Sequence, residues 1–160
     1  METTGQTFNQ YLTALRILHG AMVMGLLMFM VIIHFVLQPE PEGDSALFVN
    51  LMAGFLAICI ALSYWLYGQR VAALKTEPNL SAKLEGYRSA SIIKFALLEG
   101  PSLAALVFYL VSGNIVLLGI GALGAMVLAI NHPTAMKIKT DLDLSPADTA
   151  RVDNPNEMVM

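Results

Sequence analysis

One acidic residue lies inside the apolar part of the sequence, where it could support ion chemistry. Glu99 is the only Asp or Glu in four long apolar stretches, and it follows Ile92, the start of the third stretch, by seven residues. At 1.5 Å per residue of helix, its carboxyl group would lie about 10 Å inside that stretch. Because a charged carboxylate is costly in hydrocarbon, we expect it to be protonated, paired or hydrated, as in a proton or cation site.

The three residues after this acid extend the candidate site. Pro101 has no N–H to donate to the carbonyl of Leu97, which leaves that acceptor free within one turn of Glu99. Gly100 lets another backbone approach, and Ser102 lies on the same side of the helix as the acid. We therefore predict a bent, polar notch in which these four residues bind an ion. The alternative is a protonated Glu99 that hydrogen-bonds another helix and only fixes the packing.

Three histidines and one lysine are the other polar candidates. His19 and His34 are fifteen residues apart, roughly 22 Å along a helix, which is too far for one metal ion. His132 ends the fourth stretch, so we expect no metal site, and a haem held between His19 and His132 is an open alternative. Lys94 is expected to extend its ammonium group to the membrane boundary rather than to pair with Glu99.

Signatures of catalysis are absent from the sequence. It contains no phosphate loop, no G-x-S-x-G and no H-E-x-x-H. The single cysteine, Cys59, lies in an apolar stretch and cannot form a disulfide within the chain. The nine Lys and Arg residues are scattered, without the basic run that binds a nucleic-acid backbone. We therefore expect a protein that is not an enzyme, has no cofactor and binds no nucleic acid.

The composition indicates that most of the chain lies in a membrane. Of 160 residues, 56% are hydrophobic and 13% are charged, whereas soluble domains are about 25% charged. A membrane-crossing helix needs about 20 apolar residues, and four stretches approach that length: residues 17–37, 46–68, 92–111 and 115–131. We expect an all-α integral membrane protein, with an antiparallel bundle of four spans in residues 17–133.

The basic residues predict the orientation of these spans. Cytoplasmic loops of membrane proteins are enriched in Lys and Arg. If the four spans alternate, the candidate basic residues fall on one side: Arg16, Arg70, Lys75, Lys83, Arg88, Lys137 and Lys139. We expect a bacterial inner-membrane protein with residues 1–16, the polar segment 69–91 and residues 134–160 in the cytoplasm. The last of these would be an interfacial segment followed by a mobile tail.

Small residues and a short repeat bear on how the spans assemble. Spans pack closely where small residues recur on one face, which predicts helix packing at two stripes: Ala53, Ala57 and Ala61, and Gly121, Ala125 and Ala129. These stripes could pack within one chain or within a ring of subunits. Lys75–Ser81 and Lys139–Ser145 share the pattern K-T-acid-x-x-L-S after the second and fourth spans, so the two hairpins could form a parallel repeat.

One part of the chain resembles a known family. Residues 74–84, LKTEPNLSAKL, and residues 91–107, SIIKFALLEGPSLAALV, resemble the proteolipid c subunit of rotary ATPases. That family has a helical hairpin with a proline in its polar cytoplasmic loop, then a helix with A-x-x-E-(G/A) near mid-membrane. Residues 96–100 match that local pattern. The resemblance, over about residues 74–107, implies that Glu99 is an ion-carrying carboxylate.

Three functions follow from these observations. The first is a small membrane protein, within an oligomer, whose Glu99 binds and releases a proton or cation. The second is a non-catalytic accessory or scaffold subunit of a larger inner-membrane complex, which docks through the 69–91 segment and the tail. The third is a small-substrate transporter that acts as a dimer. The expected partners are the lipid bilayer and either further copies of the chain or other membrane subunits.

Overall fold

The described part of the chain, residues 5–41 and 45–160 of a computed structural model, folds into helices and contains no strand. This confirms the prediction of an all-α protein. The elements are α1 (Phe8–Val31), its π-helical continuation η1 (Ile32–Leu37), α2 (Ala46–Leu74), α3 (Leu80–Ser112), α4 (Ile115–Ile130), α5 (Ala135–Asp141) and α6 (Pro146–Asp153).

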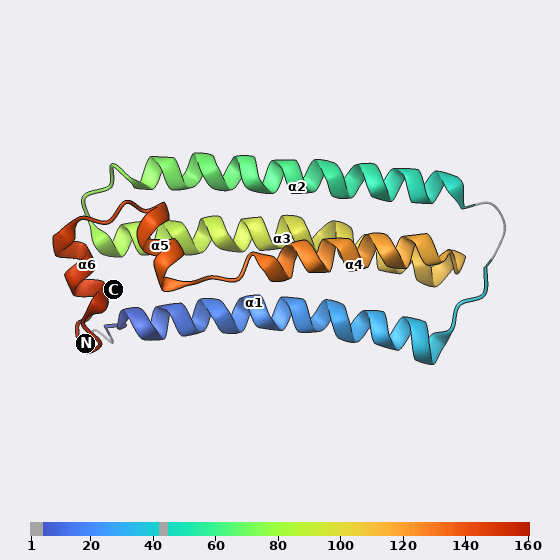
Figure 1. Cartoon of the computed structure of the whole chain (residues 1–160), viewed down its shortest axis with the longest axis horizontal. Helices are drawn as coiled ribbons and strands as arrows, with labels where there is room; N and C mark the ends of the chain where they lie inside the picture. The colour runs from blue at the N-terminus through green and yellow to red at the C-terminus, as the bar shows by residue number, and fades with distance from the viewer. Residues whose placement is uncertain (1–4, 42–44) are drawn as a thin grey trace.

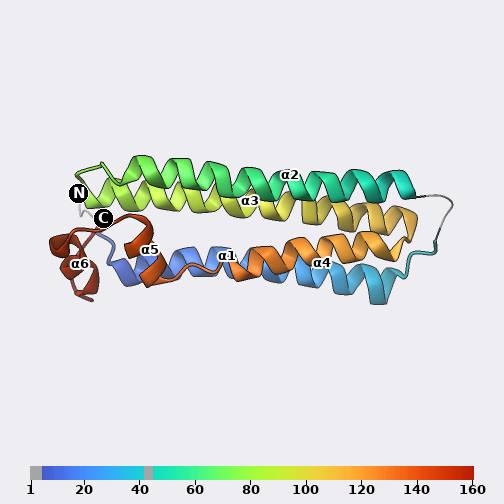
Figure 2. The same cartoon turned by 45° about the horizontal axis from the view of Figure 1, so that its top comes forward.

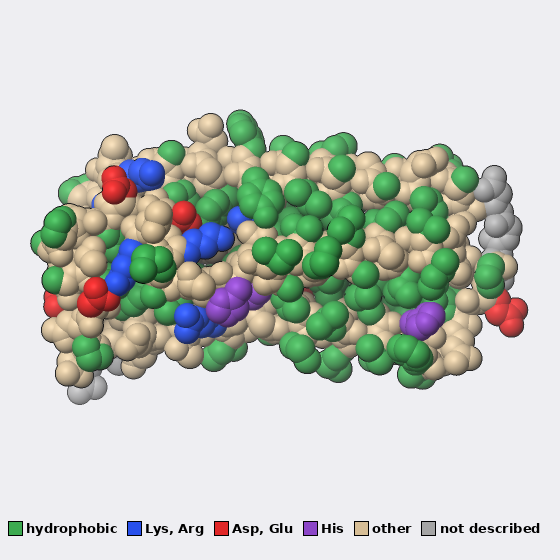
Figure 3. All heavy atoms as spheres, viewed as in Figure 1, with side chains coloured by type: hydrophobic (Ala, Val, Ile, Leu, Met, Phe, Trp, Pro, Cys, Tyr) green, Lys and Arg blue, Asp and Glu red, His purple; other side chains and the backbone are tan. Residues whose placement is uncertain are grey.

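Three helical segments are long and apolar enough to cross a membrane, namely Phe8–Leu37, Ala46–Leu74 and Leu80–Ser112. A fourth crossing requires that α4 and α5 together form one span, which is bent by 80° at the residues between them. On the face shown in Figure 3, hydrophobic side chains cover most of the length of the molecule. Charged side chains gather at the end where α5 and α6 lie.

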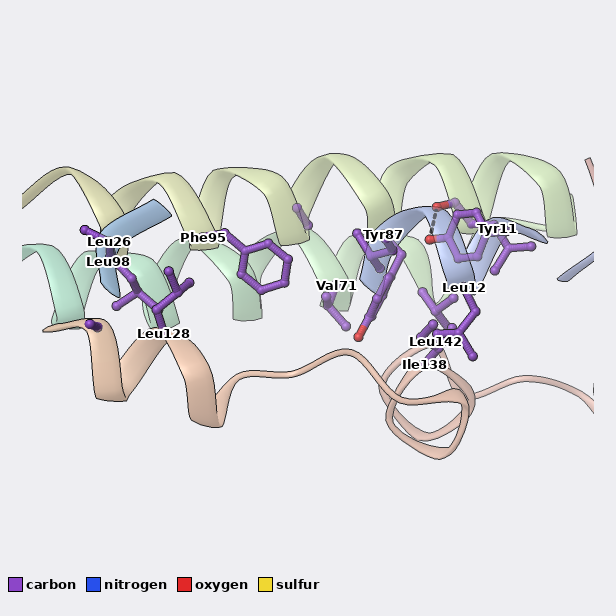
Figure 4. Packing of buried hydrophobic residues seen from close by; sticks show 14 of the residues in the cluster. Tyr11, Leu12, Leu26, Val71, Tyr87, Phe95, Leu98, Leu128, Ile138 and Leu142 are labelled. Carbon is purple, nitrogen blue, oxygen red and sulfur yellow. Dashed lines mark hydrogen bonds between the residues drawn. The ribbon is translucent and has the colours of Figure 1, made fainter. Parts of the chain in front are cut away.

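The long helices lie side by side, with α2 against α3 and α4 against α3 and α1 (Figures 1 and 2). Buried side chains from these helices form one continuous core, in which Leu26, Leu98 and Leu128 meet between α1, α3 and α4 (Figure 4). At the other end of the core, Ile138 and Leu142 lie beside Leu12 of α1. The core therefore extends beyond the apolar stretches into α5.

The polar segment 69–91, expected to be a loop, is mostly helical. Only residues 75–79 connect α2 with α3, and Asn79 caps α3 by accepting hydrogen bonds from the backbone N–H groups of Ser81 and Ala82. Leu80, Leu84 and Tyr87 follow at helical spacing and are buried. Their shared face gives this polar sequence a hydrophobic contact, and such contacts stabilise helices more than propensity does.

Residues 134–160, which we expected to be an interfacial segment followed by a mobile tail, contain two short helices and a final segment with contacts to the rest of the chain. They fold into α5 and α6, and the segment that follows pairs with the beginning of the described chain through a bridge between Thr7 and Met158. The backbone N–H of Val159 donates to the carbonyl of Gln6 at 3.0 Å, and the Val159 side chain is buried. The beginning of the described chain and its last residues therefore lie together at the end of the bundle that carries α6 (Figure 1).

The bend between α4 and α5 occurs at Asn131, His132, Pro133 and Thr134. A residue before proline disfavours the helical conformation, so α4 stops before Pro133. With 16 residues, α4 is about 24 Å long, which is shorter than the roughly 30 Å hydrocarbon core of a bilayer. Backbone that is not helical at this depth must find hydrogen-bond partners inside the protein.

Candidate functional site

The four residues predicted to form one ion-binding notch of α3 differ in their exposure. Glu99 is half-buried and Gly100 is exposed on the outer surface, whereas Pro101 and Ser102 are buried. The hydroxyl of Ser102 donates to the carbonyl of Leu98 at 2.7 Å, and the helix continues through Pro101. Successive residues of an α-helix are about 100° apart. Ser102, three residues after Glu99, is therefore only about 60° from it around the helix, and the two differ in burial and in the partner of the Ser102 hydroxyl, not in the side of α3 that they occupy.

Glu99 makes no hydrogen bond or ion pair with any described residue. A methyl group added at Gly100 would meet no atom within 4 Å, so open space lies beside the acid. Ala96 and Leu103, one turn before and one turn after, are exposed on the same face. The carboxyl group thus lies on the outside of the bundle, next to small side chains, instead of being enclosed between helices of this chain.

The two small-residue stripes differ in what they contact. Gly121 and Ala125 of α4 are buried, and a methyl group added at Gly121 would lie 2.7 Å from Leu106. Ala129, the third member of that stripe, is exposed. The α2 stripe, Ala53, Ala57 and Ala61, is exposed along its whole length. Within this chain, α2 packs through another face, formed by Met52, Leu56, Cys59 and Ser63.

Lys94 of α3 is buried, with 3% of its surface exposed, contrary to the expectation that it reaches the membrane boundary. Its ammonium nitrogen lies 4.1 Å from the ring centre of Tyr64 and 4.5 Å from that of Tyr67, both on α2. An ammonium group at this distance is attracted by the electron-rich face of an aromatic ring. The two rings therefore stabilise the ammonium group of Lys94 in a buried position beside α2.

A carboxylate from α5 completes a polar group beside this lysine. Tyr67 donates a hydrogen bond of 2.5 Å to Asp141, and Tyr87 lies 3.3 Å from the same oxygen and 2.9 Å from the Tyr67 hydroxyl. These three side chains come from α2, α3 and α5. Asp141 lies outside the four apolar stretches, so its role depends on the bend that brings α5 back onto α2 and α3.

Side chains from α1 and from the bend itself satisfy the backbone at the end of α4. The carbonyl of Leu128 is 2.9 Å from His19 Nε2, and because a carbonyl only accepts, that nitrogen must carry the proton. Arg16 donates to the carbonyl of Pro133 at 3.2 Å. Asn131 donates to the carbonyl of Val127 at 2.7 Å and to the Tyr64 hydroxyl at 2.9 Å. These hydrogen bonds from side chains therefore stabilise the bend between α4 and α5.

The side chains around Lys94 line a small cavity. Its volume is about 10 Å³, and its polar lining includes Lys94, Lys137, Ser91, Tyr87 and Asn131. A cavity of about this size holds one water molecule. The arrangement can hold one small polar species next to a buried ammonium group.

The histidines do not add a metal centre to this group. The rings of His19 and His132 lie in an edge-to-face contact, with their centres 5.6 Å apart. His19 is committed to the carbonyl of Leu128. His34 lies elsewhere, 2.9 Å from the Tyr109 hydroxyl. In the described ranges, no group of three His, Cys, Asp or Glu side chains is placed to bind a metal ion.

Comparison of the chain with protein-family models, with curated proteins and with solved structures finds no match. Two features of the fold are therefore the basis for a function. One is the unpartnered carboxyl group of Glu99 on the outer face of α3. The other is the polar group around Lys94, which the sequence did not indicate because its members are 20 or more residues apart from one helix to the next.

Proposed function

We propose that this chain is an integral membrane protein whose Glu99 binds and releases a proton or cation within an oligomer. In this proposal α1 with η1, α2, α3 and the bent segment of α4 and α5 form four antiparallel spans. The end that carries α5 and α6 faces the cytoplasm, in agreement with the basic residues gathered there.

The observation that carries the proposal is the position of Glu99. It lies thirteen residues before Ser112, where α3 ends, so it is about 20 Å from that end of the helix. With that end at one membrane surface, the carboxyl group would be well inside the roughly 30 Å hydrocarbon core. A charged carboxylate without a partner is unfavourable there, so the group would be neutral or would bind a cation.

An oligomer would supply Glu99 with the neighbouring helix that the single chain does not place beside it. Glu99 faces outward beside the open space at Gly100, and a helix of a neighbouring subunit could approach closely there. The resemblance of residues 74–107 to the proteolipid c subunit agrees with this arrangement, since it gives the acid the same place in the helix.

Carbodiimide modification of Glu99 tests the proposal. The reagent modifies a protonated carboxyl group that it can reach, and the modified peptide is quantified by mass spectrometry in membranes from pH 5 to pH 9. We expect modification at Glu99 that falls as the pH rises, and, for a site that also binds a cation, falls further with added sodium. Glu99→Gln should abolish it. Glu85→Gln, which removes an exposed acid of the same helix, should leave it unchanged.

An absence of modification at Glu99 would contradict the proposal. If Glu99 is unmodified at every pH in membranes that contain folded protein, the carboxyl group is sealed from its surroundings and ion exchange at this position is excluded. Modification that does not change with pH or sodium would mean that the acid is accessible but stays protonated throughout, so that it neither releases its proton nor exchanges it for sodium.

An accessory role in a larger membrane complex is the second candidate. It is favoured by the exposed small-residue face of α2, formed by Ala53, Gly54, Ala57 and Ala61, which would let a helix of another protein pack closely. The mass of the purified protein in detergent separates the two candidates. A defined homo-oligomer supports the first, and a monomer that becomes stable only with other subunits supports the second.

The third candidate, a small-substrate transporter that acts as a dimer, finds little support in the cavity beside Lys94. The cavity beside Lys94 has a volume of about 10 Å³, whereas sites for small organic molecules usually have several hundred Å³. The geometry there suits a single small species.

A further inference from the structure

A positive charge that no carboxylate balances lies beside the cavity at the bend. Lys94 is buried, and it forms no ion pair or hydrogen bond with any described residue. Its contacts with the rings of Tyr64 and Tyr67 attract the charge without neutralising it. A buried charge usually requires a counter-charge or several hydrogen bonds.

The charged groups nearby leave one positive charge in excess. Lys137 lines the same cavity as Lys94 and adds a second ammonium group. Asp141 is the carboxylate that acts on Lys94 from α5, but its oxygen accepts hydrogen bonds from Tyr67 and Tyr87 and lies beyond ion-pair distance of the lysine. With both lysines charged and Asp141 ionised, one monovalent anion would make the group neutral.

The size and lining of the cavity define which anion would fit. The volume of about 10 Å³ suits a single water molecule or an ion of similar size. Besides the two ammonium groups, the lining includes the hydroxyl group of Ser91, which can donate a hydrogen bond to an anion, whereas the Tyr87 hydroxyl already donates to Asp141. Polyatomic anions such as sulfate or a lipid phosphate require more space.

We propose that the cavity between α2, α3 and the bend binds one monoatomic anion, of the size of chloride, through Lys94 and Lys137. This site is separate from Glu99, which faces the outside of the bundle. The anion would link α3, which carries Lys94, to α5, which carries Lys137, and would therefore hold the bent segment against the helices.

Chloride-dependent thermal stability tests this proposal. The full chain, purified in detergent, is titrated by exchanging sodium gluconate for sodium chloride at constant sodium concentration, and unfolding is followed by the fluorescence of its single tryptophan, Trp65. Binding to the folded state raises Tm in a saturable manner. We expect such a rise in the wild-type chain, a similar rise with bromide, and none in Lys94→Met.

Lys139→Met is the matched control. Lys139 lies in the same short helix as Lys137, but it pairs with Asp153 and does not line the cavity. Its removal should leave the chloride response unchanged. If Lys94→Met does not fold, Lys137→Met replaces it, because Lys137 is only half-buried, and the response should be lost there as well.

Two results would overturn the proposal. One is a wild-type Tm that does not depend on chloride, which would mean that the cavity holds water or that Lys94 is uncharged. The other is an equal chloride response in the wild type and in the folded Lys94→Met or Lys137→Met variant, which would identify the effect as general binding of anions to surface cations.

Discussion

Gly124 controls how closely α4 approaches α3, and its replacement by alanine should destabilise the bundle. A Cβ atom at this position would overlap the Ser102 hydroxyl oxygen and would lie 3.1 Å from the Ser102 Cβ. It would also lie 3.1 Å from a methyl group of Leu56 on α2. Three helices therefore meet at a point where only hydrogen fits.

The expected loss can be worked out from these contacts. Rotating the Ser102 hydroxyl away removes its hydrogen bond to Leu98, at a cost of about 1 kcal/mol. The remaining close contacts require a shift of the helices, and overpacking of this kind costs about 1–3 kcal/mol. Alanine is favoured over glycine inside a helix by about 1 kcal/mol, which offsets part of the loss. The net effect on the free energy of unfolding should be a decrease of about 1–3 kcal/mol.

Gly119→Ala provides the matched control in the same helix, since a methyl group at Gly119 would meet no atom within 4 Å. That variant should be more stable than the wild type by about 1 kcal/mol. Unfolding in mixed micelles with increasing dodecyl sulfate, followed by circular dichroism, measures both variants. Adding Ser102→Ala to Gly124→Ala removes the overlap with the hydroxyl oxygen and should recover part of the loss. A Gly124→Ala variant as stable as Gly119→Ala would refute the close packing of α4 on α3.

The same unfolding assay tests the hydrogen bonds around the bend. Tyr67→Phe removes the donor to Asp141 and should lower the free energy of unfolding by about 1.5–3 kcal/mol, as for bonds to charged groups. Tyr64→Phe removes a neutral acceptor and serves as the comparison, so equal losses would contradict an ionised Asp141. His19→Phe leaves the carbonyl of Leu128 without its side-chain donor and should cost about 1–3 kcal/mol. An unchanged stability would mean that water replaces the imidazole.

The helical class could be predicted from the sequence because long apolar stretches have few alternatives in lipid. The length of α3 was harder to predict, because residues 80–91 contain many polar side chains. Their buried members, Leu80, Leu84 and Tyr87, show the helical period only when the polar residues between them are disregarded. The helical period of these apolar residues was present in the sequence, but the polar composition of residues 80–91 favoured a loop.

The polar group around Lys94 depends on contacts between distant segments. A lysine near the end of an apolar stretch is usually expected to reach toward water. Whether it can do so depends on which residues surround it, and here Tyr64 and Tyr67 come from the preceding helix. Periodicity within α3 carries no information about these rings.

The faces of α2 show a similar limit. Small residues at spacings of four identify a smooth face, but they do not say which partner covers it. In this chain the buried face of α2 contains Leu56 and Ser63 instead of the alanines. Comparing the polarity of the two faces offers little help, because in a membrane the side chains that face lipid are as apolar as those that face the other helices.

The bend between α4 and α5 separates two stages of the biosynthesis of this protein. The ribosome completes α2 and α3 well before it reaches Asn131 and Asp141, which later bind Tyr64 and Tyr67. Until then, Tyr64 and Tyr67 lack these two hydrogen-bond partners, although both rings are already available to Lys94. Nascent chains arrested before residue 141 should therefore contain the three long helices without the hydrogen bond from Tyr67 to Asp141.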